Sequence, residues 1–422
     1  MKKPKVLVVG INPWIDNTGI NTLINLFSDW GKESLALVYT RDSLPDTVIC
    51  SQFFQISENK LMQSALHRKV KTGSIVHNSS QTRNVQNNLY ARKHTELLSF
   101  AREFVWSIGK WRTQELRDFL DDFCPDVLFF PVYSTVYMNR LQNYIAEYTK
   151  KPYIVYSSDD NYSYLSIERT PLSYVHRFWI RKHEKKLLTD AKTIMVISPK
   201  QKEEYDALFK KQCIVLTKGI DYTGVSYEYT APHTPIKMVY TGKLIIGRGA
   251  TLQVISSAMQ RINADGVKIE LDIYTTDKPT DSQMDVLNRN GCQIKGGISL
   301  EEVRKVQNEA DVLVFVEGLD KANRYKARLS FSTKITDYLK AGKCIFAVGA
   351  EGIAPIDYFN RYDAAITASS EAEIEKKLTE LVENPGLLEQ YGKKAFLCGQ
   401  EHHDKAAQDQ ILTRTIYEAI KE

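Results

Sequence analysis

Residues 330–348 read SFSTKITDYLKAGKCIFAV, and this stretch says more about the fold than any other part of the chain. Its polar start, helical period, glycine and apolar run predict a helix that opens at Ser332 and Thr333, ends at Gly342 and leads into a buried strand. The free N–H groups and the positive dipole end at such a helix start can hold a phosphate. Lys334 adds a full positive charge at the same place.

One turn further along this helix, Asp337 supplies a carboxylate near Lys334. A diphosphate at the N–H groups and a pair of ribose hydroxyls at the carboxylate form a geometry suited to a nucleotide sugar. An ordinary capped helix with an exposed Lys334–Asp337 pair explains the segment equally well. The choice between these interpretations depends on the rest of the chain.

The composition is that of a globular protein with room for two domains. The 422 residues can bury two separate cores, and 43% hydrophobic with 25% charged residues excludes a disordered chain. The net charge of +5 does not indicate nucleic acid as a partner. The charge is uneven, however, because residues 66–117 hold ten Lys/Arg against three Asp/Glu.

Neither the cysteines nor the N-terminal residues indicate a metal site or an export signal. The six cysteines are scattered without CxxC or Cys/His spacing, so no zinc site and no disulfide are expected. The run VLVV at residues 6–9 ends at Gly10, which is too short for a signal peptide, and no apolar run reaches membrane-spanning length. We expect a cytoplasmic protein without a metal or prosthetic group, either soluble or peripheral at the inner face of the membrane.

Short Val/Ile/Leu/Phe-rich runs alternate with longer amphipathic stretches, which is the pattern of parallel sheets covered by helices on both faces. The strands predicted in the first half are Lys5–Val9, Ser34–Tyr39, Asp126–Pro131, Tyr153–Tyr156, Thr193–Ile197 and Cys213–Leu216. Those predicted in the second half are Ile236–Tyr240, Lys268–Tyr274, Asp311–Val316, Cys344–Val348 and Ala364–Thr367.

Residues 221–235 divide the two sets of strands. This segment is rich in Tyr, Thr, Gly and Pro and has no helical period, so it is the predicted interdomain linker. It separates a first α/β domain, residues 1–220, from a second, residues 236–400. Residues 401–422 predict a C-terminal helix that either ends the second domain or crosses back to the first.

The turn after the first strand of the second domain carries two cations. Gly242, Lys243 and Arg248 lie on a glycine-bearing connection from strand to helix. Two cations five residues apart can both reach one diphosphate, and cations at a helix start oppose its dipole unless an anion compensates them. We therefore prefer a diphosphate site to a solvated loop. The basic run 321–328, directly before the Ser332 helix, supports the same interpretation.

The turn after the first strand of the chain carries Trp14 and Gly19. Gly19 allows a ligand to approach the backbone at a helix start, although a glycine needed only for the turn is equally consistent with the sequence. Trp14 stands in a polar loop, and an exposed indole there suggests contact with a sugar or a lipid.

A pair of carboxylates follows a later strand of the first half. Residues 156–162 read YSSDDNY, and the carboxyl ends of strands in open α/β sheets face the ligand crevice. Asp159 and Asp160 can position an acceptor hydroxyl or act as a base, with Asn161 and Tyr162 beside them. The alternative is an Asx-capped start of the next helix, which needs one Asp only.

Residues Arg92–Arg117 form a basic amphipathic stretch that contains Phe104, Trp106, Ile108 and Trp111. Such a stretch can lie on an anionic membrane surface. A helix with its apolar side toward the core and its basic side in solvent is the alternative.

Together these features resemble a GT-B glycosyltransferase, most closely the large bacterial group that uses nucleotide sugars to build surface polysaccharides such as capsule or O-antigen. The resemblance covers essentially the whole chain. The typical helix of that group reads Pro-Ser-Lys, two residues, Glu-Tyr-Leu, two residues, Gly-Lys. Here Asp337 replaces the ribose-binding glutamate, and the residues kept are Ser332 or Thr333, Lys334, Tyr338, Leu339, Gly342 and Lys343.

The resemblance implies two Rossmann-like domains facing across a cleft. The implied reaction moves a hexose-type sugar from a nucleotide diphosphate to a hydroxyl of a lipid-linked or oligosaccharide acceptor. The implied donor-binding residues are Gly19, Gly242, Lys243, Arg248, Ile294, Gly296, Ser332, Thr333, Lys334 and Asp337, with residues 293–298 framing the nucleobase through their main chain. The implied catalytic residues are Asp159, Asp160, Lys243 and Arg248, and the implied acceptor contacts are Trp14, Asn161 and Tyr162.

The sequence departs from the group at two further positions: the histidine often seen at the acceptor side of the first domain is not evident, with Asp159 and Asp160 there instead, and the first of two glutamates is missing. Retaining members usually carry two glutamates separated by seven residues, and Leu329 stands where the first is expected. Glu317 is the candidate to replace it in space. A nucleotide-sugar epimerase of the same architecture and a catalytically silent nucleotide-binding scaffold are the alternative functions.

Overall fold

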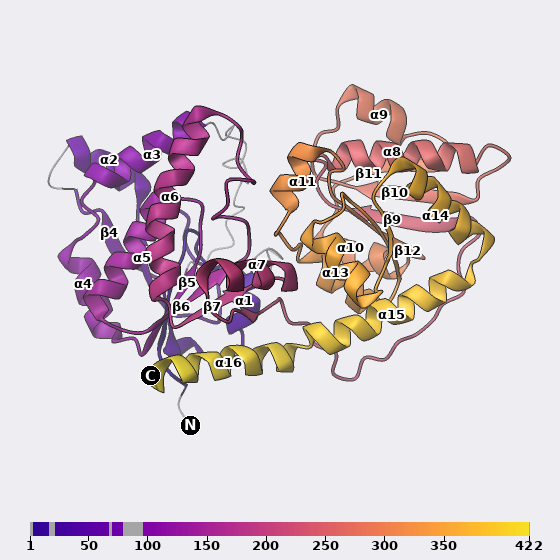
Figure 1. The fold of residues 1–422 in the computed structure, drawn as a ribbon. Helices are drawn as coiled ribbons and strands as arrows, with labels where there is room; N and C mark the ends of the chain where they lie inside the picture. The colour runs from indigo at the N-terminus through magenta and orange to yellow at the C-terminus, as the bar shows by residue number, and fades with distance from the viewer. Residues whose placement is uncertain (1–2, 17–21, 67–69, 79–95, 422) are drawn as a thin grey trace. The chain divides into compact units, whose positions relative to one another are not determined.

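The structure is a computed structural model that describes residues 3–16, 22–66, 70–78 and 96–421 (Figure 1). By its contacts the chain divides into two compact units. Unit 1 comprises Met1–Ile197, Lys202–Leu216 and Asp409–Glu422, and unit 2 comprises Ser198–Gln201 and Thr217–Gln408. In this division residues 221–235 belong to unit 2.

Unit 1 is built on an eight-stranded sheet with the order β4-β3-β2-β1-β5-β6-β7-β8. Its neighbouring strands are parallel, except that β4 is antiparallel to β3. The strands are β1 Val6–Val9, β2 Leu35–Tyr39, β3 Gln52–Ile56, β4 Gly73–Val76, β5 Val127–Pro131, β6 Tyr153–Ser157, β7 Thr193–Val196 and β8 Ile214–Val215.

The helices of the first half are α1 Thr22–Phe27, the 3-10 turn η1 Lys32–Ser34, α2 Glu58–Leu66, α3 Glu96–Ile108, α4 Gln114–Phe123, α5 Val136–Thr149, α6 Pro171–Asp190 and α7 Pro199–Phe209. The last helix of the chain, α16 Lys405–Lys421, buries Leu412 and Ile416 in the core of unit 1, among the side chains of β1, β2 and β5. Apolar side chains on both faces of these strands explain their almost continuous Val/Leu/Phe sequence.

Unit 2 contains a six-stranded, fully parallel sheet with the order β11-β10-β9-β12-β13-β14. This is the doubly wound order, in which the first strand lies at the centre and the chain then moves outward on both sides. The strands are β9 Ile236–Thr241, β10 Ile269–Tyr274, β11 Cys292–Gly296, β12 Val312–Val316, β13 Cys344–Val348 and β14 Ile366–Ala368.

The helices of unit 2 follow its strands, and α8, α9, α14 and α15 contribute side chains to one apolar core of its sheet. They are α8 Arg248–Ile262, α9 Asp281–Leu287, α10 Leu300–Asn308, α11 Lys321–Ala327, α12 Lys334–Ala341, α13 Ala354–Tyr362, α14 Glu371–Glu383 and α15 Gly386–His403. As predicted from the opening stretch, α12 ends at Gly342, whose φ of 62° is left-handed, and β13 follows directly.

All eleven predicted strands are present, with ends that differ by at most two residues. The prediction of an α/β protein with two parallel sheets is therefore confirmed. Three strands were missed, namely β3, β4 and β11. Strand β3 contains two glutamines, and β4 and β11 are edge strands with exposed positions, so none of them shows a continuous apolar run.

Candidate functional site

The candidate site lies in unit 2, where the strand order of the sheet reverses. Strands β9 and β12 are neighbours here, although β10 and β11 separate them in sequence. Ligands of doubly wound proteins bind outside the carboxyl ends of the strands at this switch point. The residues that follow these two strands are Gly242 and Glu317.

A tight turn connects β9 to α8. The backbone N–H of Leu244 donates to Asp277 (2.7 Å), which follows β10. Ile246 and Gly247 are both left-handed, with φ of 58° and 76°. A β-branched residue rarely adopts this conformation, which is unfavourable by roughly 1–3 kcal/mol, so the surroundings must hold the turn in place. A side chain at Gly247 would come within 2.9 Å of the Cα of Gly318, which explains the glycine.

Arg248, the first residue of α8, forms a bidentate pair with Glu317. Its Nε donates to Oε2 (3.1 Å) and its Nη2 donates to Oε1 (2.8 Å). The two side chains are 19% and 6% exposed. Burial alone would lower the pKa of Arg248, but the hydrogen bonds and the charge of Glu317 raise it. The guanidinium is thus charged and fixed in orientation at the end of β12.

Lys334 brings a second cation to the end of β9. Its Nζ donates to the carbonyl of Thr241 (3.1 Å) and lies 5.0 Å from the centroid of the Tyr240 ring. A Cβ at Gly242 would overlap this Nζ, so the glycine makes the close approach possible. Burial, reinforced by the charge of Arg248, lowers the pKa of Lys334 to about 8.

Lys243 is exposed on the same turn, and its carbonyl accepts a hydrogen bond from the Tyr240 hydroxyl (2.6 Å). The turn and the start of α12 therefore bring Lys243, Arg248 and Lys334 to one switch point. Burial is the main cause of the lowered pKa of Lys334, the charge of Arg248 adds to it, and Glu317 opposes it, so the two cations repel each other in part. An anion with several negative oxygens would relieve that repulsion.

The start of α12 leaves its own cap unused. Thr333 occupies the N-cap position but makes no side-chain capping bond. The hydroxyl of Ser332 accepts a weak bond, 3.4 Å, from the backbone N–H of Lys334. The predicted helix start at these residues is confirmed, and their contact with a phosphate stays a prediction.

Asp337 does not pair with Lys334 as the alternative interpretation of the opening stretch expected. Its Oδ1 accepts a hydrogen bond from Nζ of Lys218 (2.6 Å), and its side chain is 45% exposed. Lys334 instead turns toward β9, because the Thr241 carbonyl and the Tyr240 ring lie there. Nothing in the sequence pattern indicated that Lys218 contacts Asp337. The position of Tyr240 at a strand end likewise did not indicate its contact with Lys334.

The residues expected around a nucleobase belong to the edge strand β11. Ile294 is partly buried against the core of unit 2. The carbonyl of Gly296, whose φ is 83°, accepts a hydrogen bond from the N–H of Thr275 (2.9 Å). Their contact with a base stays a prediction. Gly19, the remaining donor residue of the sequence analysis, lies outside the described residues.

The structure gives the carboxylates of unit 1 different surroundings. Asp160 is 5% exposed and accepts hydrogen bonds from the backbone N–H (3.0 Å) and hydroxyl (2.5 Å) of Ser163. It thus caps a turn, while Thr170 caps the next helix, α6. The expectation that both carboxylates are available to an acceptor is wrong for Asp160, because its side chain closes its own loop. Asp159 is exposed.

The neighbours of Asp160 are also used within the fold. Asn161 accepts from the hydroxyl of Ser134 (2.7 Å) and donates to the carbonyl of Val132 (3.2 Å). Tyr162 is 7% exposed, and the Arg181 guanidinium lies 4.0 Å from its ring centroid. Their predicted contact with an acceptor has no support from these surroundings.

The tryptophans expected on the surface are mostly buried. Trp14 is 1% exposed and stacks on Phe27 with centroids 6.1 Å apart, so the expectation of an exposed indole is wrong. The loop around Trp14 is polar in sequence, but the indole turns into the core of unit 1. Trp106 and Trp111 of the Arg92–Arg117 stretch are buried as well.

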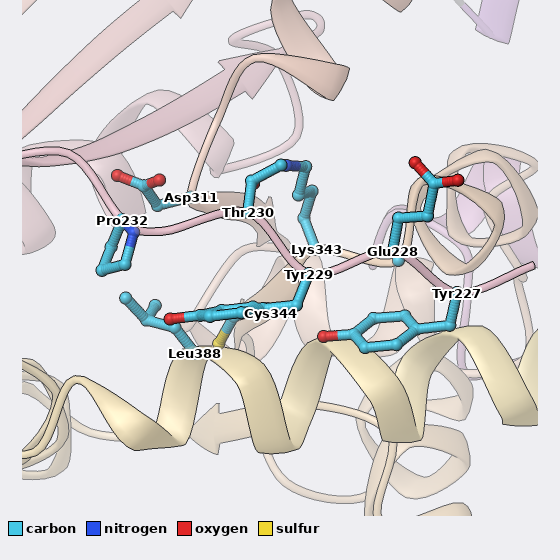
Figure 2. A pocket seen from close by; sticks show the side chains of 10 residues that line it. Tyr227, Glu228, Tyr229, Thr230, Pro232, Asp311, Lys343, Cys344 and Leu388 are labelled. Atoms are coloured by element: carbon cyan, nitrogen blue, oxygen red, sulfur yellow. The ribbon is translucent and has the colours of Figure 1, made fainter.

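Two pockets of unit 2 lie at opposite ends of the strands of its sheet. The pocket of Figure 2 lies at the amino ends of β12 and β13, where it is lined by Asp311, Lys343 and Cys344. A larger one lies where β13 and β14 end, and Lys321 and Arg324 of α11 contribute to it. Of these two, only the second lies at the carboxyl ends of the strands, where the cations also lie.

The described part of the chain contains neither a metal-binding cluster nor a membrane-spanning helix. Among residues 3–16, 22–66, 70–78 and 96–421, no group of three or more His, Cys, Asp or Glu side chains is arranged to hold a metal ion. No helix in this part of the chain is long and apolar enough to span a membrane.

Comparison with known proteins gives a result at the level of structure. No protein-family model matches the sequence, and no curated protein matches it. The crystal structure of Anabaena HepE in complex with UDP matches with a TM-score of 0.63 and 9% identity, covering 98% of this chain and 100% of that chain. Sucrose-phosphate synthase from Thermosynechococcus elongatus matches with a TM-score of 0.65 and 10% identity, covering 98% of both chains.

The α,α-trehalose 6-phosphate synthase of Burkholderia multivorans gives a third match, with a TM-score of 0.58, 9% identity and coverage of 99% of this chain and 97% of that chain. These similarities extend over both units. The chain therefore has the GT-B fold of glycosyltransferases, built from two Rossmann-like units, and the expected fold is confirmed.

Proposed function

We propose that the chain is a glycosyltransferase that moves a sugar from a nucleotide diphosphate donor to a hydroxyl acceptor. The observation that carries the proposal is the grouping of Lys243, Arg248 and Lys334 at the switch point of unit 2. A glycine opens the strand end there, and three cations gathered around one paired carboxylate, Glu317, favour the binding of an anion. The GT-B fold makes a nucleotide sugar the anion to test first.

The chemistry of the site follows from its charges. When the bond between sugar and diphosphate breaks, negative charge develops on the departing phosphate oxygens. Arg248, held by Glu317, and Lys334, held by Thr241, are fixed donors that need no reorganisation to meet this charge. Lys243 is exposed on the turn and can add a third contact. Such preorganised stabilisation is the main catalytic contribution that we assign to this unit.

The nucleoside would lie beyond the diphosphate. Asp337, one turn into α12, is half exposed and offers a carboxylate to ribose hydroxyls, with Lys218 fixing its orientation. The main chain around Ile294 and Gly296 would then meet the base. HepE was solved with UDP, UDP and glucose, and UDP-glucose, which supports a uridine nucleotide as the first choice for a donor.

For the acceptor we propose a hydroxyl of a lipid-linked or oligosaccharide substrate in surface polysaccharide synthesis, with a hexose as the transferred sugar. Asp159 is the remaining candidate from the sequence to meet the acceptor hydroxyl, since it is exposed after β6. Glu317 is occupied by Arg248, so its role is to position that guanidinium.

The first experiment is a thermal-shift panel of nucleoside diphosphates and their sugars. A ligand that binds the folded state at about 100 times its Kd adds roughly 2.7 kcal/mol of stability, a shift that is easily seen. The expected result is stabilisation by one base class. The stabilising nucleotide sugar, labelled in the sugar, is then incubated with saccharide acceptors.

The panel and the transfer assay separate the alternatives. Label in a saccharide product supports the transferase. Conversion of the donor to a sugar epimer without an acceptor would identify an epimerase, and binding without turnover would point to a scaffold. No stabilisation by any diphosphate would contradict the proposed site itself.

A further inference from the structure

The first turns of α6 have their polarity reversed relative to an ordinary helix of a globular protein. The side chains buried toward unit 1 over these turns are Ser173, His176 and Arg177, followed by the apolar Ile180. The outward side chains over the same turns are apolar: Leu172, Tyr174, Val175, Phe178 and Trp179, which are 39–55% exposed. A helix on a protein surface normally directs its apolar side toward the core and its charges toward water.

Helix α3 also exposes apolar side chains, although its Trp106 is buried. Leu97, Phe104 and Ile108 are 73%, 63% and 50% exposed and recur at helical spacing. Arg102 and Glu103 of this helix point inward. Arg102 donates to Glu58 of α2 (2.5 Å), and Glu103 accepts the backbone N–H groups of Val136 and Tyr137 (2.7 and 2.8 Å) at the start of α5.

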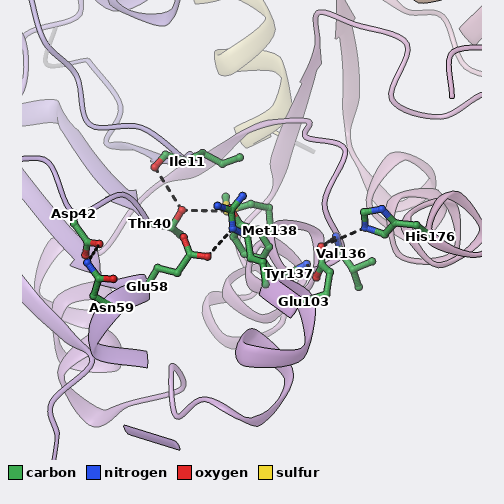
Figure 3. Close-up of polar contacts among 11 residues, drawn as sticks. Ile11, Thr40, Asp42, Glu58, Asn59, Glu103, Val136, Tyr137, Met138 and His176 are labelled. Carbon is green, nitrogen blue, oxygen red and sulfur yellow. Dashed lines mark hydrogen bonds and ion pairs between the residues drawn. The ribbon is translucent and has the colours of Figure 1, made fainter. Parts of the chain in front are cut away.

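Figure 3 shows these inward polar contacts, including the one that joins the two helices. The imidazole Nε2 of His176 lies 3.7 Å from Glu103, and the His176 ring lies 5.0 Å from that of Phe100. Helices α3 and α6 are therefore neighbours in unit 1, with their polar sides turned toward the body of the unit (Figure 1). We call their outward apolar side chains the α3–α6 face.

The chemistry of the α3–α6 face indicates its partner. Helix α6 carries five Lys/Arg against two Asp/Glu, and Lys182 and Lys185 are exposed one turn beyond the apolar residues. The Lys182 ammonium lies 5.1 Å from the centroid of the Trp179 ring. Tyr174 stacks on Tyr164, with centroids 5.9 Å apart. Aliphatic and aromatic side chains flanked by lysines match the boundary between headgroups and acyl chains of an anionic bilayer.

We infer that the α3–α6 face binds the surface of a membrane that contains anionic phospholipids. The apolar side chains enter the acyl boundary, the Trp179 and Tyr174 rings lie at headgroup level, and Lys182 and Lys185 meet the lipid phosphates. The sequence alone suggested membrane contact for Arg92–Arg117. The structure adds α6 to that suggestion and removes Trp106 and Trp111 from it, because both are buried.

The tryptophans provide a direct test with the full-length protein. All five tryptophans of the chain lie in described residues, and Trp179 is 44% exposed whereas the other four are at most 4% exposed. Fluorescence is recorded during titration with vesicles of phosphatidylcholine alone and with 30% phosphatidylglycerol added. The expected result is a blue shift with the anionic vesicles, absent from the matched variant Trp179→Phe although that variant still co-sediments.

A double variant tests the surface itself. Phe178→Glu with Val175→Glu should weaken binding to anionic vesicles by about tenfold or more, since two apolar side chains no longer enter the lipid. Val267→Glu, an exposed valine of unit 2, is the control and should bind as the native protein does. Thermal unfolding checks that all variants are folded. No donor is present, so the result does not depend on the proposed sugar transfer.

Three outcomes would overturn this inference. The first is no binding of the native protein to anionic vesicles. The second is equal binding by the double variant. The third is a dimer of the native protein, in the absence of lipid, that the double variant converts to monomer, because the face would then contact a second copy of the chain.

Discussion

In unit 2 positively charged side chains lie close together at the carboxyl ends of β9 and β12. In unit 1, by contrast, the polar side chains that follow β6 form hydrogen bonds within their own loop. Lys334 and Arg248 are fixed by the Thr241 carbonyl and by Glu317, and Glu317 offsets their repulsion in part. Asp160 is already satisfied by Ser163. Both sheets are doubly wound, so topology alone does not make the end of a strand a binding site.

This difference separates two uses of polar residues. A charged side chain that lies near a like charge, or that a glycine allows to approach a strand end, indicates a ligand-binding site. A polar group whose hydrogen bonds are complete within its own loop is structural.

Removing the two cations of the α8 turn should have the largest effect. Lys243→Ala combined with Arg248→Ala should lower donor turnover by about 10³-fold, since a fixed donor such as Arg248 is typically worth about 10²–10³-fold and the exposed Lys243 adds less. The measurement is release of the nucleoside diphosphate from the donor identified in the panel. Lys340→Ala, an exposed lysine at the other end of α12, is the control. Turnover that survives the double variant would place the chemistry elsewhere.

Trp14 should behave as a core residue of unit 1. Trp14→Ala should lower the free energy of unfolding by about 3–5 kcal/mol, because a large buried side chain is lost and its cavity remains. Urea denaturation measures the change, and Trp179→Ala, at an exposed position, should change stability by less than about 0.5 kcal/mol. A Trp14→Ala protein of native stability with impaired acceptor binding would restore the sequence-based interpretation.

The affinity for a nucleoside diphosphate should depend on pH through Lys334. Its pKa is lowered to about 8, so below this value the ammonium is charged and attracts the ligand, and above it the charge is lost. Affinity should fall as pH rises, by up to about tenfold per unit between pH 8 and the pKa of the free side chain near 10.4. Calorimetric titration at pH 7, 8 and 9 measures the affinity for the nucleoside diphosphate.

The matched variant for this titration is Lys334→Arg, whose side chain stays charged over the whole range. Its affinity should vary little with pH. A native protein whose affinity does not change between pH 7 and 9 would exclude Lys334 from the contact with the diphosphate.

Asp337 should contribute to nucleoside binding only. Asp337→Ala should weaken the affinity for a nucleoside diphosphate by about fivefold, since hydrogen bonds to the ribose are lost, and leave that for inorganic pyrophosphate unchanged. Calorimetry with both ligands distinguishes the two effects. Equal weakening for both ligands would show that Asp337 acts through Lys218 or the start of α12 instead.

The same contrast explains what could be predicted from the sequence. Helix α12 and strand β13 follow from local signals, namely hydroxyl residues, helical period, a terminal glycine and an apolar run, and each was found within one or two residues. Arg248 and Lys243 could be chosen because cations at a helix start are unfavourable without an anion.

The errors also have physical reasons. The exposure of Trp14 depends on where the chain returns in three dimensions, and a polar loop does not reveal that. Asp160 and Asp159 are identical in type, and only the position of Ser163 shows that Asp160 is already used. The direction of Lys334 depends on the distant Thr241 carbonyl, and the contact of Lys218 with Asp337 joins residues 119 positions apart.

A single added methyl group gives the most direct test of the cation site. In Gly242→Ala the new Cβ would overlap Nζ of Lys334 and lie 3.0 Å from the Tyr240 hydroxyl, at a backbone φ of 158°, so Lys334 must move and some stability is lost. The control is Gly386→Ala, where the space is open, and thermal unfolding checks that both variants are folded. Calorimetric titration with inorganic pyrophosphate should then show at least about tenfold weaker binding for Gly242→Ala than for the native protein and the control. Equal pyrophosphate affinity in all three proteins would contradict the assignment of this strand end as the diphosphate site.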